Sequence, residues 1–304
     1  MPWPNLWILG PPKCGTSSLF RWLADHPQVA AASEKEPFYL VDPESPFRRP
    51  EANFTDHGLS GYDRYLPEPC SQTFRLDGTT HTLFQRTAVE VLADLDPSPW
   101  AVAVLRKPSE RIYSSFQFTR HVLAALDPTL GFAEFCELRE RGDVATLERR
   151  CRRPRSLWVL LRDLEYSDYH RWLVPWSRGL GDRLRLLVFE QLQTDPNATV
   201  TGLATGLGLD ESFYDGYDFP RLNRTFRARS PWLHRWARTL RPRVPRHPAT
   251  LALYRFYLKF QKRRHEPEPR PAEDIEWLAR LDRRFAESNR RLGDAFDLDL
   301  ARWQ

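Results

Sequence analysis

The segment that most constrains the fold is residues 6–24, which combine an apolar run, a glycine-containing loop and an amphipathic stretch. Residues 6–9 (LWIL) are apolar and stop at a Gly-Pro-Pro sequence, which is typical of a buried strand followed by a loop. Residues 17–24 carry their large apolar side chains on one helical stripe. A glycine loop between a strand and a helix directs backbone N–H groups and the helix N-terminus at one point, which attracts phosphate. These residues therefore predict an α/β fold with an anion-binding loop near its start.

Two further apolar runs are predicted to be strands of the same sheet. They are residues 100–105 (WAVAVL) and residues 184–189 (LRLLVF). Between them, Pro108 and Ser109 open a predicted helix that extends to about His121, with Ser109 as its N-cap. Strands that alternate with helices form a mostly parallel sheet covered on both faces, so we expect a P-loop-like three-layer α/β fold.

No linker divides the chain, so we expect one domain over residues 1–304. Residues 41–75 are rich in proline, glycine and aromatic residues, which predicts an irregular insertion. Residues 241–304 are predicted to form a helical extension, whose last helix has Glu273 in its first turn and ends at Gly293.

Composition narrows the class of protein. The 304 residues carry a net charge of +5, from 45 basic and 40 acidic residues, which suits an anionic ligand but is too small to indicate nucleic acid. The four cysteines form no CxxC pair, which argues against a zinc site or a thioredoxin-like redox pair. No run of 18 apolar residues occurs and the N-terminus does not resemble a signal peptide, so we expect no membrane span and a cytoplasmic location.

The first loop, residues 10–18 (GPPKCGTSS), departs from the Walker A pattern GxxxxGK[ST]. Gly10 and Gly15 fit that pattern, but Thr16 stands at its lysine position and the lysine of the loop is Lys13. A nucleoside triphosphatase needs its lysine on the β- and γ-phosphates and the following Ser or Thr on magnesium. The loop therefore indicates a phosphate ligand without Walker A chemistry. The alternative is a tight turn with a solvent-exposed lysine.

A second anion-binding motif follows the strand at residues 100–105. Arg106 stands at the C-terminal end of that strand, where open α/β sheets bind ligands, and Ser114 lies in the next helix. A guanidinium and a hydroxyl can converge there on one phosphate. The alternative is a helix start with ordinary solvated basic residues.

Taken together, the two motifs resemble the binding motifs of the sulfotransferase superfamily for 3′-phosphoadenosine 5′-phosphosulfate (PAPS). Residues 12–19 (PKCGTSSL) resemble the 5′-phosphosulfate loop, and residues 106–116 (RKPSERIYSSF) resemble the 3′-phosphate motif R-x-P-x-x-R-x-x-S. Residues 26–39 (HPQVAAASEKEPFY) are similar to a stretch shared by bacterial sulfotransferases and relatives of the heparan-sulfate enzymes. The resemblance covers about residues 5–230.

This resemblance implies in-line sulfuryl transfer from PAPS to a hydroxyl, or less readily an amine, without a metal ion. Lys13 and the N–H groups at the start of the first helix would stabilise charge on the leaving 5′-phosphate. The acceptor would be a small molecule, a lipid or a carbohydrate, and no nucleic-acid partner is expected. The implied donor-binding residues are Pro12, Lys13, Cys14, Gly15, Thr16, Ser17, Ser18, Arg106, Ser114 and Arg227.

The acceptor must lose a proton, so a general base is expected close to Lys13. Glu36 is the first candidate, Glu34 the second and His81 the third. For Glu36 an alternative is a helix-capping role, because Ser33-x-x-Glu36 has the form of a capping box. Lys35 stands at a position that is acidic in some relatives, which leaves the base open and gives Lys35 a possible contact with the sulfuryl group.

Some residues depart from the heparan-type pattern. Residues 77–80 (DGTT) replace an E-K-[ST]-P stretch, with Gly78 at the lysine position, and residues 223–230 replace a cysteine loop. These differences argue against a heparan-like acceptor and favour a bacterial-type enzyme. Two other classes stay open: a P-loop nucleotide kinase or NTPase, and a non-catalytic polyanion-binding protein that uses the Arg-rich residues 221–246.

Overall fold

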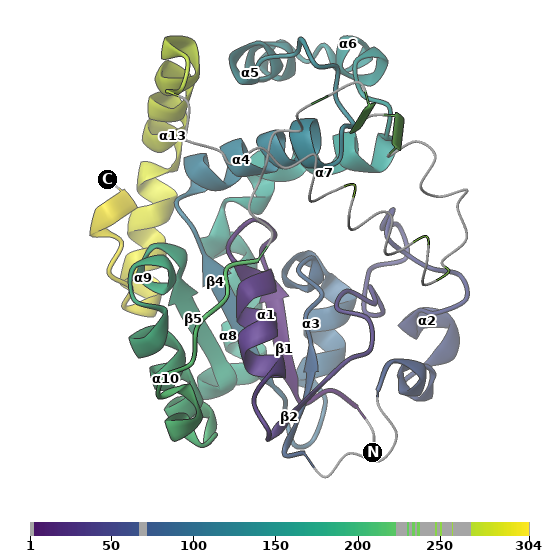
Figure 1. The fold of residues 1–304 in the computed structure, drawn as a ribbon, viewed down its shortest axis with the longest axis vertical. Coiled ribbons are helices and arrows are strands. Elements are labelled where there is room, and N and C mark those ends of the chain that lie inside the picture. The colour runs from purple at the N-terminus through teal and green to yellow at the C-terminus, as the bar shows by residue number, and fades with distance from the viewer. Residues whose placement is uncertain are drawn as a thin grey trace. The chain divides into compact units, whose positions relative to one another are not determined.

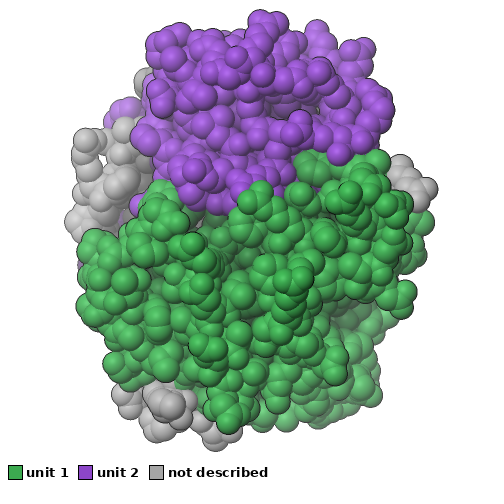
Figure 2. Space-filling model, turned by 180° about the vertical axis from the view of Figure 1, so that it is seen from behind, with its two compact units in different colours: residues 1–107, 168–223, 285–304 green, residues 108–167, 224–284 purple. Residues whose placement is uncertain are grey.

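The computed structural model describes residues 3–66, 72–222 and 269–303, together with residues 230, 233, 234, 236, 237, 247, 250 and 257. The chain forms two compact units (Figure 2). The first unit contains residues 1–107, 168–223 and 285–304, and the second contains residues 108–167 and 224–284. The predicted single domain, with its irregular insertion and its helical extension, stays a prediction.

The first unit is built on a five-stranded parallel sheet with the strand order β2-β3-β1-β4-β5 (Figure 1). This sheet confirms the predicted α/β fold. Three of the strands match the apolar runs of the sequence, and the two short strands β2 and β3 lie within segments for which no strand was predicted. The strands are β1 (Leu6–Gly10), β2 (Val29–Ala31), β3 (Phe74–Asp77), β4 (Trp100–Leu105) and β5 (Leu184–Val188).

The central strands β1 and β4 are apolar because helices cover both faces of the sheet. On one face, Leu6, Ile8, Val102 and Val104 pack into one buried cluster with residues of α1 (Thr16–Ala24) and α10 (Pro196–Leu207). On the other face, α8 (Tyr169–Leu180) contacts β4 and β5, and α3 (Arg86–Ala93) packs against α8. The remaining helical segments of this unit are α2 (Phe54–His57), η1 (Ser60–Tyr65), η2 (Thr82–Phe84), η4 (Gly181–Arg183), α9 (Phe189–Thr194), η5 (Glu211–Tyr214) and η7 (Ala301–Trp303).

The described part of the second unit is helical. It contains α4 (Pro108–Gln117), the π-helical turn η3 (Phe118–Val122), α5 (Phe132–Glu140), α6 (Val144–Arg149), α7 (Pro154–Tyr166) and the first half of α13 (Ala272–Phe296). None of the helices among the described residues of the chain is long and apolar enough to cross a membrane.

Two predicted helix ends are wrong. Ser109 is not the N-cap of α4, because the helix already begins at Pro108; the Ser109 hydroxyl donates to the Asp282 carboxylate of α13. Gly293 does not end α13, which continues to Phe296. A glycine ends a helix when the chain turns there with a positive φ, and Gly293 is not among the glycines with a positive φ.

A buried ion pair joins α4 to α7 in the second unit. Arg111 donates to the Asp163 carboxylate at 2.9 Å, and the two side chains are 0% and 1% exposed. Arg111 also donates to the Ser167 hydroxyl at 2.9 Å. Arg111 is the second arginine of the R-x-P-x-x-R-x-x-S motif, and these contacts give it a structural role.

Candidate functional site

The first loop turns from β1 into α1 through a backbone that needs glycine. Gly10 has a φ of 120° and Gly15 a φ of 83°, both on the side that favours glycine. A Cβ atom at Gly10 would lie 1.9 Å from the Thr80 carbonyl oxygen. Lys13 has a φ of 74°, which is uncommon for a residue with a side chain. The loop is thereby held tightly between Thr80 and the start of α1.

The loop presents a cationic and helix-dipole environment to any anion. The first turn of α1 contains no acidic residue, so no carboxylate of this turn offsets the positive end of the helix dipole. Of the predicted donor-binding residues, Pro12, Lys13, Gly15 and Ser17 are partly exposed, whereas Cys14, Thr16 and Ser18 are buried.

The side chains of two buried loop residues make contacts within the protein. The Cys14 side chain belongs to the core cluster, so only its backbone can serve a ligand. The Ser18 hydroxyl accepts from the Leu222 N–H at 3.0 Å. Among the loop side chains, those of Lys13 and Ser17 are both polar and partly exposed, so an anion can reach them.

Arg106 lies beside the first loop, as its place at the end of β4 predicted. Its guanidinium donates to the Lys13 carbonyl oxygen at 3.2 Å and lies 4.8 Å from the ring centroid of Phe189. The Tyr169 hydroxyl donates to the Arg106 carbonyl oxygen at 2.8 Å. Two cationic residues that are 93 positions apart thus meet at one end of the sheet.

Two more residues, Ser114 and Arg227, were predicted to bind the donor. Ser114 is a partly exposed residue of α4, within the second unit. Arg227 lies outside the described residues.

Lys35 and Glu36 form an ion pair after β2. The Lys35 ammonium donates to Glu36 Oε1 at 2.7 Å and to the Gly78 carbonyl oxygen at 3.2 Å. The Thr80 hydroxyl donates to the same Glu36 oxygen at 3.2 Å. Both charged side chains are partly open to solvent, with 26% and 34% exposed. No helix begins between Ser33 and Glu36, so the capping-box interpretation of Glu36 is wrong.

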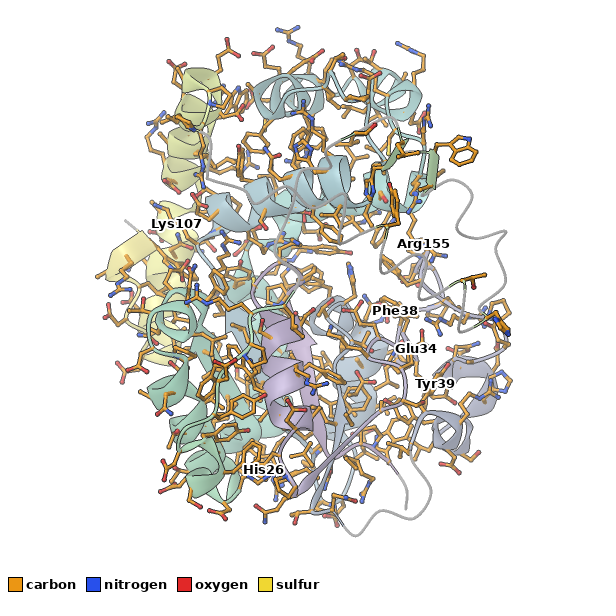
Figure 3. All side chains as sticks on the ribbon, in the orientation of Figure 1. His26, Glu34, Phe38, Tyr39, Lys107 and Arg155 are labelled. Carbon is orange, nitrogen blue, oxygen red and sulfur yellow. The ribbon has the colours of Figure 1, made fainter. Side chains whose placement is uncertain are left out.

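The other two candidate bases are engaged differently. Both oxygens of Glu34 accept from the Arg49 guanidinium, at 2.6 and 2.7 Å, and Arg49 also lies 5.8 Å from the Phe38 ring centroid. Glu34 and Phe38 are labelled in Figure 3. His81 is buried, with its ring 4.5 Å from that of Phe47. Of the three candidates, Glu36 is the one that combines solvent access with a lysine contact.

Asp77 is a buried acid beside this pair that the sequence analysis did not select. It is the last residue of β3, and its carboxylate accepts from the Tyr62 hydroxyl and from the Thr79 N–H at 2.6 Å. Burial raises the pKa of Asp77 to about 6, although these hydrogen bonds and Lys35 act to lower it. Burial also raises the pKa of Tyr62 well above its usual value.

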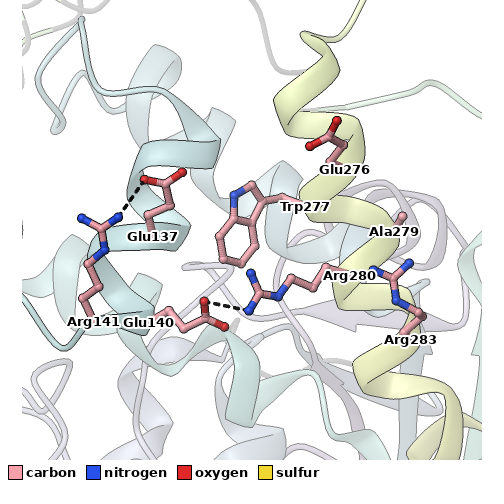
Figure 4. Close-up of a pocket in the computed structure, with 8 residues that line it drawn as sticks. All are labelled: Glu137, Glu140, Arg141, Glu276, Trp277, Ala279, Arg280 and Arg283. Carbon is pink, nitrogen blue, oxygen red and sulfur yellow. Dashed lines mark ion pairs between the residues drawn. The ribbon is translucent and has the colours of Figure 1, made fainter.

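A separate hollow lies in the second unit between α5 and α13 (Figure 4). Its charged residues are partly matched within the hollow, since Arg280 pairs with Glu140 at 3.0 Å and Arg141 with Glu137 at 3.7 Å. It includes none of the residues predicted from the sequence. Its lining residues are Glu137, Glu140, Arg141, Glu276, Trp277, Ala279, Arg280 and Arg283.

No group of three or more His, Cys, Asp or Glu side chains that could hold a metal ion occurs within residues 3–66, 72–222 and 269–303. At the first loop, the groups that attract an anion are the Lys13 ammonium, the Arg106 guanidinium and the N-terminus of α1.

Comparison with known proteins places residues 4–216 within the family model described as "Sulfotransferase domain". The chain is 26% identical over 216 residues to the human bifunctional heparan sulfate N-deacetylase/N-sulfotransferase 3, a match that covers 68% of this chain and 22% of the relative. It is 26% identical over 218 residues to the mouse N-deacetylase/N-sulfotransferase 4, with the same coverage. The chain thus spans about a fifth of the length of these relatives.

A solved structure has a similar fold. The crystal structure of a sulfotransferase from Alicyclobacillus acidocaldarius aligns with a TM-score of 0.63 at 20% identity and covers 99% of this chain and 98% of the other.

Proposed function

Because this chain belongs to the sulfotransferase family, we propose that it transfers a sulfuryl group from PAPS to a hydroxyl or amine of a carbohydrate acceptor. The observation that carries the donor half of this proposal is the contact between Arg106 and the Lys13 carbonyl oxygen, at 3.2 Å. It joins the two sequence motifs that would bind the two ends of one doubly phosphorylated nucleotide.

At the donor end, the bond that breaks joins sulfur to the bridging oxygen of the 5′-phosphate. Negative charge grows on that phosphate as the sulfuryl group leaves, so fixed positive groups lower the barrier. Lys13 and the N-terminal N–H groups of α1 would supply that charge, and Arg106 would bind the 3′-phosphate. The sulfuryl group is held in line with its acceptor, as in phosphoryl transfer.

At the acceptor end, Glu36 would take the proton of the attacking hydroxyl or amine, so that the new bond to sulfur forms as the proton leaves. The Thr80 hydroxyl and the Lys35 ammonium orient the Glu36 carboxylate in the structure described above. The Lys35 ammonium is the nearest cation to Glu36 and would also stabilise charge on the transferred sulfuryl oxygens.

A carbohydrate is the acceptor class that we put first, because the similar proteins named above are heparan sulfate N-sulfotransferases. Because these relatives are N-sulfotransferases, an amine acceptor is better supported than the sequence analysis, which favoured a hydroxyl, had indicated. An acceptor other than heparan stays open, because two features of the heparan-type pattern are replaced in this chain. Gly78 stands at the position of its lysine, and residues 223–230 stand in place of its cysteine loop. The nucleotide kinase alternative is disfavoured by Thr16, which stands where such an enzyme needs a lysine.

The proposal is tested by incubating the full chain with PAPS labelled in its sulfate and two polysaccharides. One is N-desulfated and offers free amines, and the other is N-acetylated and offers only hydroxyls. We expect label in at least one polymer, with its loss in Lys13→Ala and its retention in Arg21→Ala, which truncates a 58% exposed side chain on α1. Equal transfer by Lys13→Ala and the wild type would contradict the role of Lys13, and no transfer to either polymer would contradict the acceptor class.

A further inference from the structure

A buried carboxylate next to the Lys35–Glu36 pair has no part in the chemistry proposed so far. The Asp77 side chain is fully buried and, within the described residues, makes no ion pair within 4 Å. Its hydrogen bonds come from the Tyr62 hydroxyl and the Thr79 N–H. A buried acid without a paired cation is costly to keep ionised, so its presence at this point in the fold calls for a function.

The Asp77 carboxylate fixes the turn formed by residues 77–80. It accepts from the N–H two residues ahead, at 2.6 Å, in the manner of an Asx turn. The two turn atoms that touch the charged pair come from the next residues: the Gly78 carbonyl accepts from Lys35, and the Thr80 hydroxyl donates to Glu36, each at 3.2 Å. One turn therefore orients both charged groups.

This turn has little room to move relative to the first loop. Gly10 lies so close to the Thr80 carbonyl that a Cβ atom there would approach it to 1.9 Å. A Cβ atom at Gly78 would lie 2.5 Å from the Phe20 ring of α1. The turn is thus packed against both flanks of the loop proposed to bind the donor, and any shift of the turn changes the distance between the donor loop and the charged pair.

We propose that Asp77 is a positioning residue for sulfuryl transfer, which sets the places of Lys35 and Glu36 through the turn of residues 77–80. This inference rests on the proposed function. Asp77 touches neither donor nor acceptor, and its effect passes through the Gly78 carbonyl and the Thr80 hydroxyl. Misplacement of reacting groups by about 1 Å can lower a rate by about 100-fold, so a small relaxation of this turn has a measurable consequence.

The charges around Asp77 agree with this role. Lys35 lowers the pKa of Asp77, so the ammonium and the carboxylate attract one another across the turn. Burial holds the pKa of Asp77 at about 6, so at neutral pH the group is ionised and the attraction is present. Tyr62 is the other titratable group in contact with Asp77, and the raised pKa of Tyr62 keeps it a hydrogen-bond donor at neutral pH.

The test compares Asp77→Asn with the wild type at pH 7.5. Asparagine keeps the shape and an acceptor for the Thr79 N–H but removes the charge. The control is Asp25→Asn, which alters a second Tyr–Asp hydrogen bond of the same unit, from Tyr217 at 2.6 Å, at the opposite end of α1 from the loop. We expect kcat to fall about 10-fold or more in Asp77→Asn, with KM for PAPS and the Kd of adenosine 3′,5′-bisphosphate changed less than about twofold, and no change in Asp25→Asn.

A second readout does not need turnover. The chain has five lysines, so the side-chain NMR signal of Lys35 can be assigned by its loss in Lys35→Arg. We expect this signal to shift in Asp77→Asn and to stay unchanged in Asp25→Asn.

The proposal is overturned by a wild-type kcat in Asp77→Asn, by an unmoved Lys35 signal, or by a fall in kcat matched by an equal loss of nucleotide affinity. If the Lys35 signal shifts in Asp77→Asn but the wild-type protein transfers no sulfate, the proposed function is refuted. The coupling between Asp77 and Lys35 still stands in that case.

Discussion

The buried acid Asp77 makes the stability of this protein depend on pH in a direction opposite to that of an ordinary salt-bridged carboxylate. Its pKa rises from 3.8 to about 6 on folding because the ionised form loses its hydration. The folded state therefore holds a proton that the unfolded state releases between these two pH values. By linkage, the contribution of Asp77 to the free energy of unfolding is greatest at low pH and falls as the pH rises through 6.

The size of this effect follows from the two pKa values. A difference of about 2 pH units corresponds to a loss of about 3 kcal/mol, most of it between pH 4 and pH 7. Asp77→Asn is uncharged at every pH, so it removes this dependence. Any constant cost of the new contact between the asparagine amide and the Tyr62 hydroxyl shifts the variant equally at all pH values and leaves the slope untouched.

The assay is urea unfolding of the wild type and Asp77→Asn at pH 4.5, 6 and 7.5. We expect the free energy of unfolding of the wild type, relative to that of the variant, to fall by about 2 kcal/mol across this range. If the difference in the free energy of unfolding between the wild type and Asp77→Asn stays constant with pH, Asp77 is not ionised at a desolvation cost in the native protein.

Three further predictions concern individual side chains. Glu36→Gln should lower kcat, measured by initial rates, with little effect on PAPS affinity, measured by calorimetry. Glu34→Gln should lose only the exposed ion pair with Arg49. A loss of kcat in Glu34→Gln but not in Glu36→Gln would move the general base to Glu34. Arg106→Ala should weaken binding of adenosine 3′,5′-bisphosphate more than that of adenosine 5′-monophosphate, and an equal loss for both nucleotides would contradict contact with the 3′-phosphate. Arg111→Ala should lower the free energy of unfolding by about 3–5 kcal/mol, because it leaves the buried Asp163 unpaired, and a change below about 1 kcal/mol in chemical denaturation would show that α4 and α7 do not depend on this pair.

The sequence predicted the parts of the fold whose pattern is long enough to read. The run at residues 100–105 coincides with β4 because a central parallel strand is apolar on both faces. The strands β2 and β3 have only three and four residues, so the apolar run of β2 (VAA) and the alternation of β3 (FRLD) are too short to indicate a strand by themselves. Their places in the sheet depend on pairing with β1 and with each other, which is tertiary information.

The candidate site was predictable where a motif carried it and not where packing decided it. Lys13 and Arg106 follow from their places at strand ends, and the structure brings them together. The sequence put Glu36 before Glu34 as the candidate base, and the structure adds a difference that the sequence does not contain, because the Arg49 guanidinium binds Glu34. Asp77 gave no signal, since an aspartate at the end of a strand is usually solvated, and only its burial beside Tyr62 distinguishes it.

We propose that the first loop and Arg106 bind a nucleotide with phosphates at both the 3′ and 5′ positions. Calorimetry in the presence of a chelator tests this binding without knowledge of the acceptor. We expect adenosine 3′,5′-bisphosphate to bind the wild-type chain at one site without magnesium, more tightly than adenosine 5′-monophosphate. We also expect Lys13→Ala to weaken this binding and the control Arg21→Ala to leave it unchanged. A chain that binds ATP only with magnesium and shows no heat with adenosine 3′,5′-bisphosphate would contradict it.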